Sequence, residues 1–552
     1  MSETLNQTIF DVTQGYLEKI NPQHPNSPVQ IEMDILDELG DAISIHNASA
    51  QKGFAWKIPQ KLNFIQIAEI MARLHNICCV KTAGATAPSE YDLLAIYQPD
   101  GPDEGIYVTD IEAFRSIAKQ YNYTITDSEF RECLVSLRNI VPHKEPCMDR
   151  DLIAVNNGIF DYETKQLMPF SPNYIFMSKS RVNYNDQAYN VTIHNPNDNT
   201  DWDVEGWMDD LSDDPEIVHV LWQVLGAIIR PHVSWNQAAW LYSESGNNGK
   251  GTLCVLMQQL CGEGSYTSLK LSEMSKDFAL EPLIRSSAII TDENDVGTYI
   301  DRAANLKSLV TGDSVNINRK FKQGITYKFH GFMVQCMNEM PRIKDKSDSF
   351  FRRQLFIPFT KCFTGKERKY IKDDYLRRQE VLEYVLYKVL NMDYYSFDMP
   401  KACQKALNEY KEYNDPVRQF FHEVVPEAEW DVLPFKLLYD LYRRWFKENN
   451  PSGTLQNKTS FIKDITNVAK ESDEWGTKGK DGQTRIGSYM SVCEPLLDIY
   501  DLKSWQNPDK QYSGNNMQER CTPKPGQFPE KVRGIYRINP KHGNIPIQTI
   551  DD

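Results

Sequence analysis

The chain has 552 residues, of which 41% are apolar and 25% charged, and this balance excludes collagen-like, mucin-like and wholly disordered chains. Acidic residues outnumber basic ones by 76 to 61, giving a formal charge of −15, so a wholly basic coat protein is excluded and nucleic acid would need local basic patches. The longest nearly apolar stretch, residues 220–229, is too short to cross a bilayer and the amino terminus lacks a signal-peptide pattern, so we expect a cytoplasmic protein with no membrane partner.

The first 145 residues predict a small α+β domain without recognisable chemistry. Apolar residues at helical spacing predict a helix over residues 62–75, and the runs 93–97 and 106–108 flank a turn like a hairpin. Thr126 and Glu129 form a capping-box pattern before another amphipathic helix. The 11 cysteines of the chain are scattered without a C-x-x-C pair, so we expect reduced thiols and no zinc site.

The middle of the chain predicts a connecting region and then an α/β domain. Residues 201–216 carry eight carboxylates and no base, which is typical of a solvated face, with a partner-binding tail as the alternative. A helix is predicted over residues 217–228, and strand-like and helical runs then alternate over residues 232–361. This alternation is typical of a βα sheet domain.

The carboxy-terminal part predicts helices over residues 381–390, 417–421, 435–446 and 461–469. A basic Gly/Lys turn follows in GTKGKDGQTRIGSYM, and three helices before a basic hairpin are the order of a winged-helix module. The resulting domains are an N-terminal domain, a collar region, an ATPase core, a helical lid and a C-terminal winged-helix-like domain (1–145, 146–231, 232–365, 366–414 and 415–552).

A glycine-containing loop follows the strand-like run 238–242. The loop SESGNNGKGT leads into apolar residues at helical spacing. Strand, loop with lysine and helix is an arrangement that binds phosphate, because backbone N–H groups and the positive end of the helix dipole face the anion. We expect ATP to be held by Gly246, Asn247, Asn248, Gly249, Lys250, Gly251 and Thr252.

This loop departs from the pattern G-x-x-x-x-G-K-[ST] at two positions. Glu244 stands at the first glycine, and Gly251 stands at the position of the usual hydroxyl. Lys250 is expected to neutralise the β and γ phosphates, and Thr252 is the substitute candidate for binding Mg²⁺. The alternative is that Asn-Gly-Lys forms an ordinary turn.

Two adjacent carboxylates end the next apolar strand, in the sequence AIITDEND. Asp292 can hold Mg²⁺ through its water shell, while Glu293 can polarise the water that attacks the γ-phosphate. Asp-Glu at a strand end is also common on protein surfaces. Together with the phosphate loop, the pair indicates a nucleotide hydrolase.

A third apolar strand ends in an amide and is followed by two arginines. Asn338 in VQCMNEMP can orient the attacking water without altering the charge of the site. Arg352 or Arg353 in FRRQLFIPF can reach a neighbouring subunit's phosphate, an effect of roughly a thousandfold in rate, or on the order of 4 kcal/mol. The alternative for both arginines is an exposed edge charge.

Between these strands lies a basic segment. Residues 302–328 hold six basic side chains and one acidic one, and we expect a hairpin that turns around Gln323 and Gly324. Its candidate DNA-binding residues are Arg319, Lys320, Phe321 and Lys322. Cations for phosphates and a ring for stacking suit a single strand, although a solvated basic hairpin is equally compatible with the sequence.

These motifs, in this order, resemble the ATPase core of superfamily-3 helicases, and more narrowly the phage and plasmid primase-helicases related to the poxvirus primase-helicase. The motifs are SESGNNGKGT, AIITDEND, LKSLVTGDSVNINRKFKQ, VQCMNEMP and FRRQLFIPF. The segments DLIAVNNGIFDYETKQLMPFSP and DDPEIVHVLWQVLGAIIR resemble the region before that core. The resemblance covers about residues 90–360.

The resemblance implies an α/β AAA+ P-loop ATPase core, ATP and Mg²⁺ as cofactors, and a homohexameric ring that moves 3′ to 5′ on DNA. Lys250 and Asn247 match the family's phosphate loop, Asp292 and Glu293 its acidic pair, and Asn338 its sensor amide. Arg353 aligns best with the arginine donated to the adjoining subunit, ahead of Arg352, and Lys307 matches a basic residue near that shared site. Arg319 and the residues after it fall on the hairpin that tracks one DNA strand.

We therefore expect an ATP-dependent DNA helicase for the replication of a phage or mobile element, working in the host cytoplasm. Its partners would be single-stranded and forked DNA, further copies of itself, and a separate primase or initiator. Residues 1–150 offer no acidic metal cluster for a primase, so we expect no priming activity. Two rivals remain at this point: a DNA-stimulated ATPase motor of another class, and an origin-binding or scaffold protein with a decayed ATPase site.

Overall fold

The computed structural model of the protein describes residues 4–51, 53–82, 88–300, 302–320, 322–449, 455–478, 482–510 and 516–542. The chain divides into two compact units, residues 1–406 and residues 407–552, and the boundary falls within helix α13 (Lys401–Asn414). Among the helices of these described ranges, none combines the length and the apolar character that a membrane span requires.

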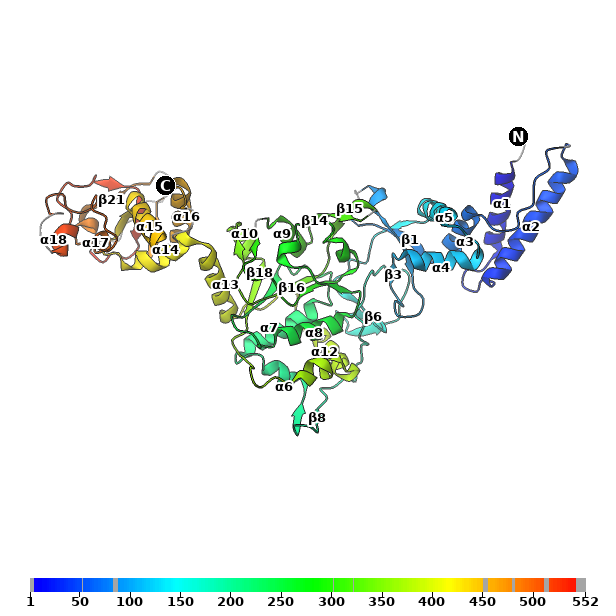
Figure 1. Ribbon diagram of the computed structural model, residues 1–552, viewed down its shortest axis with the longest axis horizontal. Coiled ribbons are helices and arrows are strands. Elements are labelled where there is room, and N and C mark those ends of the chain that lie inside the picture. Colours follow the sequence, from blue (N-terminus) through cyan, green and yellow to red (C-terminus); the bar gives the residue numbers. More distant parts are fainter. Residues whose placement is uncertain are drawn as a thin grey trace. The chain divides into compact units, whose positions relative to one another are not determined.

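The first unit begins with five helices and a small sheet, and α1 and α2 pack against α3 and α4 on the side away from the sheet (Figure 1). The helices are α1 (Leu5–Lys19), α2 (Pro28–Ser49), α3 (Phe64–Leu74), α4 (Ile111–Tyr121) and α5 (Asp127–Ile140). The strands, in sheet order, are β3 (Tyr107–Val108), β2 (Leu93–Tyr97), β1 (Ile77–Val80) and β4 (His143–Lys144). The expected helix at 62–75, the hairpin β2–β3 and the capping box of Thr126 and Glu129 are confirmed.

The connecting region contains short antiparallel strands and two helices. The elements are β5 (Leu152–Val155), β6 (Gly158–Asp161), β7 (Gln166–Met168), β8 (Ile193–Asn195), β9 (Thr200–Trp202), α6 (Val204–Asp209) and α7 (Pro215–Ala227). Two carboxylates of the acidic run cap helices, because Asp203 accepts from the Gly206 N–H and Asp214 from the Glu216 N–H. The run is therefore more than a solvated face, and α7 confirms the helix expected after it.

A five-stranded parallel sheet forms the centre of the first unit. Its order is β11 (Tyr266–Thr267), β12 (Ala288–Thr291), β16 (Phe332–Met337), β10 (Ala238–Tyr242) and β18 (Gln354–Pro358). The strands β10, β12 and β16 are almost wholly buried, and their side chains share one core with α7, α8 (Lys250–Cys261) and α12 (Gln379–Leu390) (Figure 1). This confirms an α/β sheet within a multidomain chain.

Shorter elements surround this sheet. They are β13 (Tyr299–Ile300), α9 (Ala304–Thr311), β17 (Arg342–Ile343), α10 (Asp348–Phe351) and α11 (Lys369–Asp373). The basic segment forms the expected hairpin from β14 (Ser314–Arg319) and β15 (Lys322–Lys328). Its turn, however, lies between Arg319 and Lys322, and not at Gln323 and Gly324 as the sequence suggested.

The second unit packs helices against a three-stranded antiparallel sheet. The helices are α14 (Pro416–Val424), α15 (Phe435–Asn449), α16 (Lys458–Lys470), α17 (Leu496–Ile499) and α18 (Met517–Cys521). The sheet order is β19 (Val432–Pro434), β23 (Gly534–Arg537) and β20 (Trp475–Thr477), and β21 (Thr484–Arg485) pairs with β22 (Lys531–Val532). The first three helices confirm the expected ones.

The basic hairpin expected in the second unit is not formed by its described strands. The strand β20 pairs with β23, which is distant in sequence, and β21 pairs with β22. The physical reason is burial: Trp475 in β20 and all four residues of β23 lie in the core, so the two strands stabilise each other there.

Candidate active site

The carboxyl ends of three neighbouring parallel strands bring the predicted polar residues to one edge of the central sheet. The strand β16 lies between β10 and β12, with Tyr242 opposite Met337 and Thr291 opposite Gln335. The phosphate-loop candidate follows β10, the acidic pair follows β12 and Asn338 follows β16. Ligand sites of open α/β sheets lie at such an edge.

The loop after β10 makes a tight turn that leads into α8. Asn247 and Gly249 both have left-handed φ values, +55° and +88°, and Gly249 is the N-cap of α8. A Cβ at position 249 would also lie 2.6 Å from Leu211 Cδ2, so only glycine fits there. Asn248 is buried and braces the turn, since its amide donates to the Ser245 carbonyl and its Oδ1 accepts from the Lys250 N–H.

Lys250 is a buried cation held by a neutral amide. Its side chain is only 5% exposed, and Nζ donates to Asn338 Oδ1 at 2.9 Å. Burial lowers the pKa of the Lys250 ammonium, while the charge of Asp292 acts in the opposite direction. Burial removes water from the ammonium, and its hydrogen-bond partner carries no negative charge. A bound anion would supply that charge, so the site favours anion binding.

Asp292 and Glu293 are exposed, whereas the residue that follows them locks the segment in place. The Asn294 amide donates to Gln335 Oε1 at 2.9 Å and to the Cys336 carbonyl at 3.0 Å, and Gln335 in turn donates to Thr291 Oγ1. This buried network holds the end of β12 against β16. Sequence reasoning missed Asn294 and Gln335, because their roles depend on the strand register.

Gly251, which stands where the common phosphate loop has a hydroxyl residue, lies beside Asp292. A Cβ at Gly251 would be 3.0 Å from Asp292 Oδ1, so the residue after Lys250 faces the carboxylate expected to hold Mg²⁺. The exposed oxygen ligand of Asp292 suits Mg²⁺, which prefers carboxylates and water. Asp292, with Thr252 as the nearby half-buried hydroxyl, would hold the ion.

A segment after β18 lies against the phosphate loop, and sequence reasoning missed it. Asn247 donates from its amide to Thr364 Oγ1 and to Glu367 Oε1, each at 3.2 Å, and its carbonyl accepts from the Phe363 N–H at 2.7 Å. Gly246 accepts from the Cys362 thiol. No motif in residues 362–367 indicates these contacts.

The predicted arginines differ in their surroundings. Arg353 donates from Nη1 to the carbonyl and the hydroxyl of Ser349 in its own chain, and its Nε is buried without a hydrogen-bond partner among the described residues. Arg352 is exposed. Lys307 lies in an ion pair of 2.6 Å with Asp345; burial would raise the pKa of Asp345, but its bonds to Lys307 and Ser347 lower it.

The basic hairpin presents its predicted residues unevenly. Lys320 is exposed, whereas Arg319 is half-buried and donates from Nε to the Gln323 carbonyl at 2.9 Å. Burial lowers the pKa of Arg319. Phe321 and the side chain of Lys322 lie outside the described residues.

Three families match separate parts of the chain. Residues 50–213 match the family described as D5 N terminal like, residues 241–353 match a family of unknown function, DUF5906, and residues 412–507 match the family described as Poxvirus D5 protein-like. The phosphate loop, the acidic pair and Asn338 therefore all fall in the DUF5906 segment.

Solved structures with weak similarity include the A form apo structure of the NrS-1 C terminal region. It has 13% sequence identity and a TM-score of 0.42, over 80% of this chain and 91% of that chain. Another apo structure of the same region has 13% identity and a TM-score of 0.39, over 74% of this chain and 87% of that chain.

Proposed function

Because the chain belongs to the D5-like primase-helicase family of phages and poxviruses, we propose that it is an ATP-dependent DNA helicase for the replication of a phage or mobile element. In this proposal the central sheet is an AAA+ P-loop core and residues 415–552 are a winged-helix-like domain that contacts duplex DNA. The chain works as a homohexamer that moves 3′ to 5′ along single-stranded DNA at a fork.

One observation carries this proposal: the buried ammonium of Lys250, at the start of α8, donates to Asn338, which follows β16. Exposed Asp292 and Glu293 follow the neighbouring strand β12. A triphosphate would replace the amide as the main partner of Lys250. Glu293 would then accept a proton from the attacking water, and Asn338 would orient that water.

The remaining residues fit roles around this centre. The loop from Gly246 to Gly251 would surround the phosphates with backbone N–H groups. Bound Mg²⁺ would supply charge neutralisation near Asp292 and Thr252. An arginine from a neighbouring copy, Arg352 or Arg353, would stabilise the negative charge of the transition state, and exposure favours Arg352.

A decayed ATPase site in a scaffold protein is the alternative that one observation favours. Glu244 and Gly251 remove two features of the common phosphate loop, and no hydroxyl stands at the position that faces Asp292. The intact bracing of the loop by Asn248, however, supports a working site.

The test compares ATP turnover and unwinding of forked DNA among wild type, Lys250→Ala and Glu293→Gln. We expect both variants to lose about a hundredfold or more in turnover, while Glu263→Gln, an exposed site at the other end of α8, stays near wild type. Equal and negligible turnover in all proteins would leave only the scaffold. DNA-stimulated hydrolysis without unwinding would instead indicate a motor of another class.

A further inference from the structure

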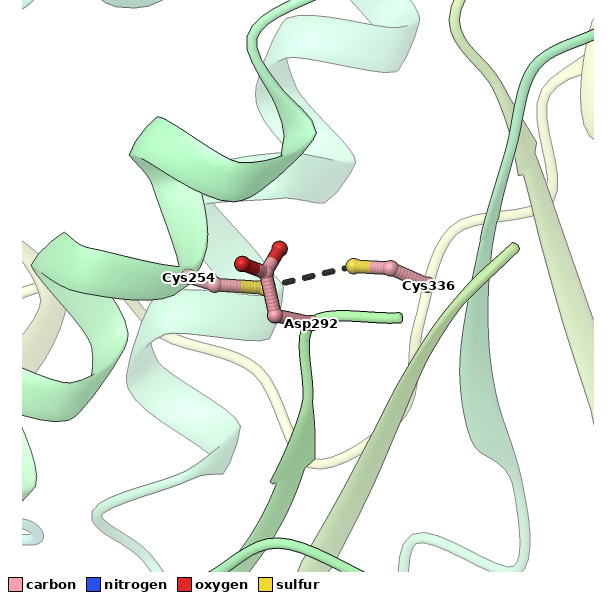
Figure 2. A group of neighbouring side chains, drawn as sticks. All are labelled: Cys254, Asp292 and Cys336. Carbon is pink, nitrogen blue, oxygen red and sulfur yellow. Dashed lines mark hydrogen bonds between the residues drawn. The ribbon is translucent and has the colours of Figure 1, made fainter. Parts of the chain in front are cut away.

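Two buried cysteines lie close to the exposed carboxylate of Asp292, which is also part of the proposed nucleotide site. Cys254 lies in α8, Asp292 follows β12 and Cys336 lies in β16 (Figure 2). The two sulfurs are 3.3 Å apart, and both sulfurs and a carboxylate oxygen lie within 4.8 Å of one another. Cys254 is 1% exposed and Cys336 is 0% exposed.

The three ligand atoms come from separate segments, so local spacing could not indicate them. The expectation of no zinc site depended on the absence of closely spaced cysteines in the sequence. In the fold, the strand β16 and the helix α8 bring together residues that are 82 positions apart. Cys254 and Cys336 lie within α8 and β16, and Asp292 directly follows β12, whose end the Asn294 amide holds against β16.

The donor chemistry distinguishes this cluster from a magnesium site. Mg²⁺ takes oxygen ligands in octahedral geometry, whereas two thiolates and one carboxylate are a ligand set for Zn²⁺ or Cd²⁺. Three protein ligands leave a fourth tetrahedral position open to water. Asp292 is exposed, so the carboxylate of the ligand set is accessible from solvent.

We propose that Cys254, Cys336 and Asp292 form a binding site for a thiophilic divalent cation such as Zn²⁺ or Cd²⁺. Binding of one cation releases the two thiol protons to solvent and forms two metal–sulfur bonds and one metal–oxygen bond. Two thiolates and a carboxylate leave one negative charge on the loaded site. Lys250 interacts electrostatically with all three ligands and offsets that charge.

The site has a consequence that rests on the proposed function. Asp292 cannot serve Mg²⁺ at the nucleotide while it is bound to a cation held by the two sulfurs. Excess Mg²⁺ would not displace that cation, because Mg²⁺ binds thiolates poorly. Zn²⁺ should therefore inhibit ATP turnover, and a zinc chelator should restore it.

The direct test is titration of reduced, nucleotide-free full-length protein with Cd²⁺. Thiolate-to-metal absorption in the ultraviolet reports sulfur ligation, and metal analysis after dialysis reports stoichiometry. All proteins carry Cys362→Ser, because Cys362 is exposed. The test variants are Cys254→Ala, Cys336→Ala and Asp292→Asn, and the matched control is Cys261→Ala, which removes another buried sulfur from the same helix.

We expect the Cys362→Ser protein and the control to bind one Cd²⁺ per chain with thiolate absorption. Each of the two cysteine variants should lose that absorption and bind more than about a hundredfold more weakly, and Asp292→Asn about tenfold more weakly. Asp292 is exposed, so this third variant remains informative should a buried alanine prevent folding.

Two results would overturn the inference: no thiolate absorption in the Cys362→Ser protein, or absorption in both cysteine variants that is as strong as in the Cys362→Ser protein. The outcome is separate from that of the proposed function. A protein that binds Cd²⁺ but never hydrolyses ATP would contradict only the helicase proposal. Hydrolysis of ATP without Cd²⁺ absorption would contradict only the metal site.

Discussion

Lys250 shows how a single residue can be placed for function at a cost in stability. Its ammonium is buried, and Nζ donates to the neutral amide oxygen of Asn338. Burial lowers the pKa of this group in the folded chain. Its cost is therefore fully present below the folded pKa and disappears as the pH rises above the ordinary lysine value.

Replacing this cation should stabilise the protein while abolishing the proposed ATP turnover. We expect Lys250→Met to raise the free energy of unfolding at neutral pH by about 1 kcal/mol, with a smaller difference in alkaline buffer. Thermal unfolding without nucleotide, at both pH values, measures the effect. Lys369→Met at an exposed site should change stability by less than about 0.5 kcal/mol, and a lower midpoint for Lys250→Met than for wild type would contradict the argument.

The basic hairpin illustrates what the sequence could and could not predict about an element. Its two strands were predictable from composition, but the turn was placed at Gln323 and Gly324. A turn there would set Ile317 opposite His330, whereas the observed register sets it opposite Ile325, and both isoleucines are buried. A bulge after Ile317 completes this register, and Gly324 has no positive φ.

The observed register places exposed Lys320 in the turn between Arg319 and Lys322, which sharpens the DNA-binding prediction for this segment. The double variant Lys320→Ala with Lys322→Ala should bind single-stranded DNA more weakly and with a flatter dependence on salt, since fewer counterions are released. Titrations at several salt concentrations measure the slope. The control pair Lys57→Ala with Lys119→Ala, both exposed and outside the hairpin, should keep the wild-type slope; an unchanged slope in the test pair would argue against the hairpin.

Other elements could be predicted where their apolar residues recur at regular spacing in the sequence. The helices α3, α5 and α12 each place apolar residues on one stripe, whereas α7 is buried on nearly all sides, and all four were expected. The helix α2 carries the same signal, with Ile31, Ile35 and Leu39 buried at a spacing of four, but it was overlooked. The pairing of β20 with β23 could not be predicted, because it joins segments far apart in the chain.

At the scale of the whole molecule, the sequence indicated which residues could take part in chemistry better than it indicated which residues are in contact. The segments with the phosphate loop, the acidic pair and the amide were each singled out in the sequence, and the fold brings them to one sheet edge because parallel strands align their carboxyl ends. The contacts of Asn247 with Thr364 and Glu367, and of Cys254 with Cys336, depend on the closed tertiary fold. Such contacts follow from packing between distant segments and leave no local pattern.

The proposed nucleotide site needs an arginine that a single chain does not place there. Arg353 is bonded to Ser349 in its own chain, while Arg352 is exposed, so either arginine must act on a neighbouring copy if the proposed ring is correct. A closed head-to-tail interface would supply one such arginine to every site. The prediction is that two inactive proteins with different defects can restore a working site when they assemble together.

Mixing an arginine variant with Glu293→Gln should therefore recover part of the ATP turnover. In a mixed ring, some sites combine the intact Glu293 of the arginine variant with the intact arginine of the other chain, and only those sites hydrolyse ATP. Arg352→Ala and Arg353→Ala are each mixed with Glu293→Gln, and exposure predicts recovery with Arg352→Ala. Recovery with Arg353→Ala alone would mean that the bond to Ser349 opens in the ring. Absence of recovery in both mixtures, with mixed assembly verified by differently tagged chains, would contradict action across an interface.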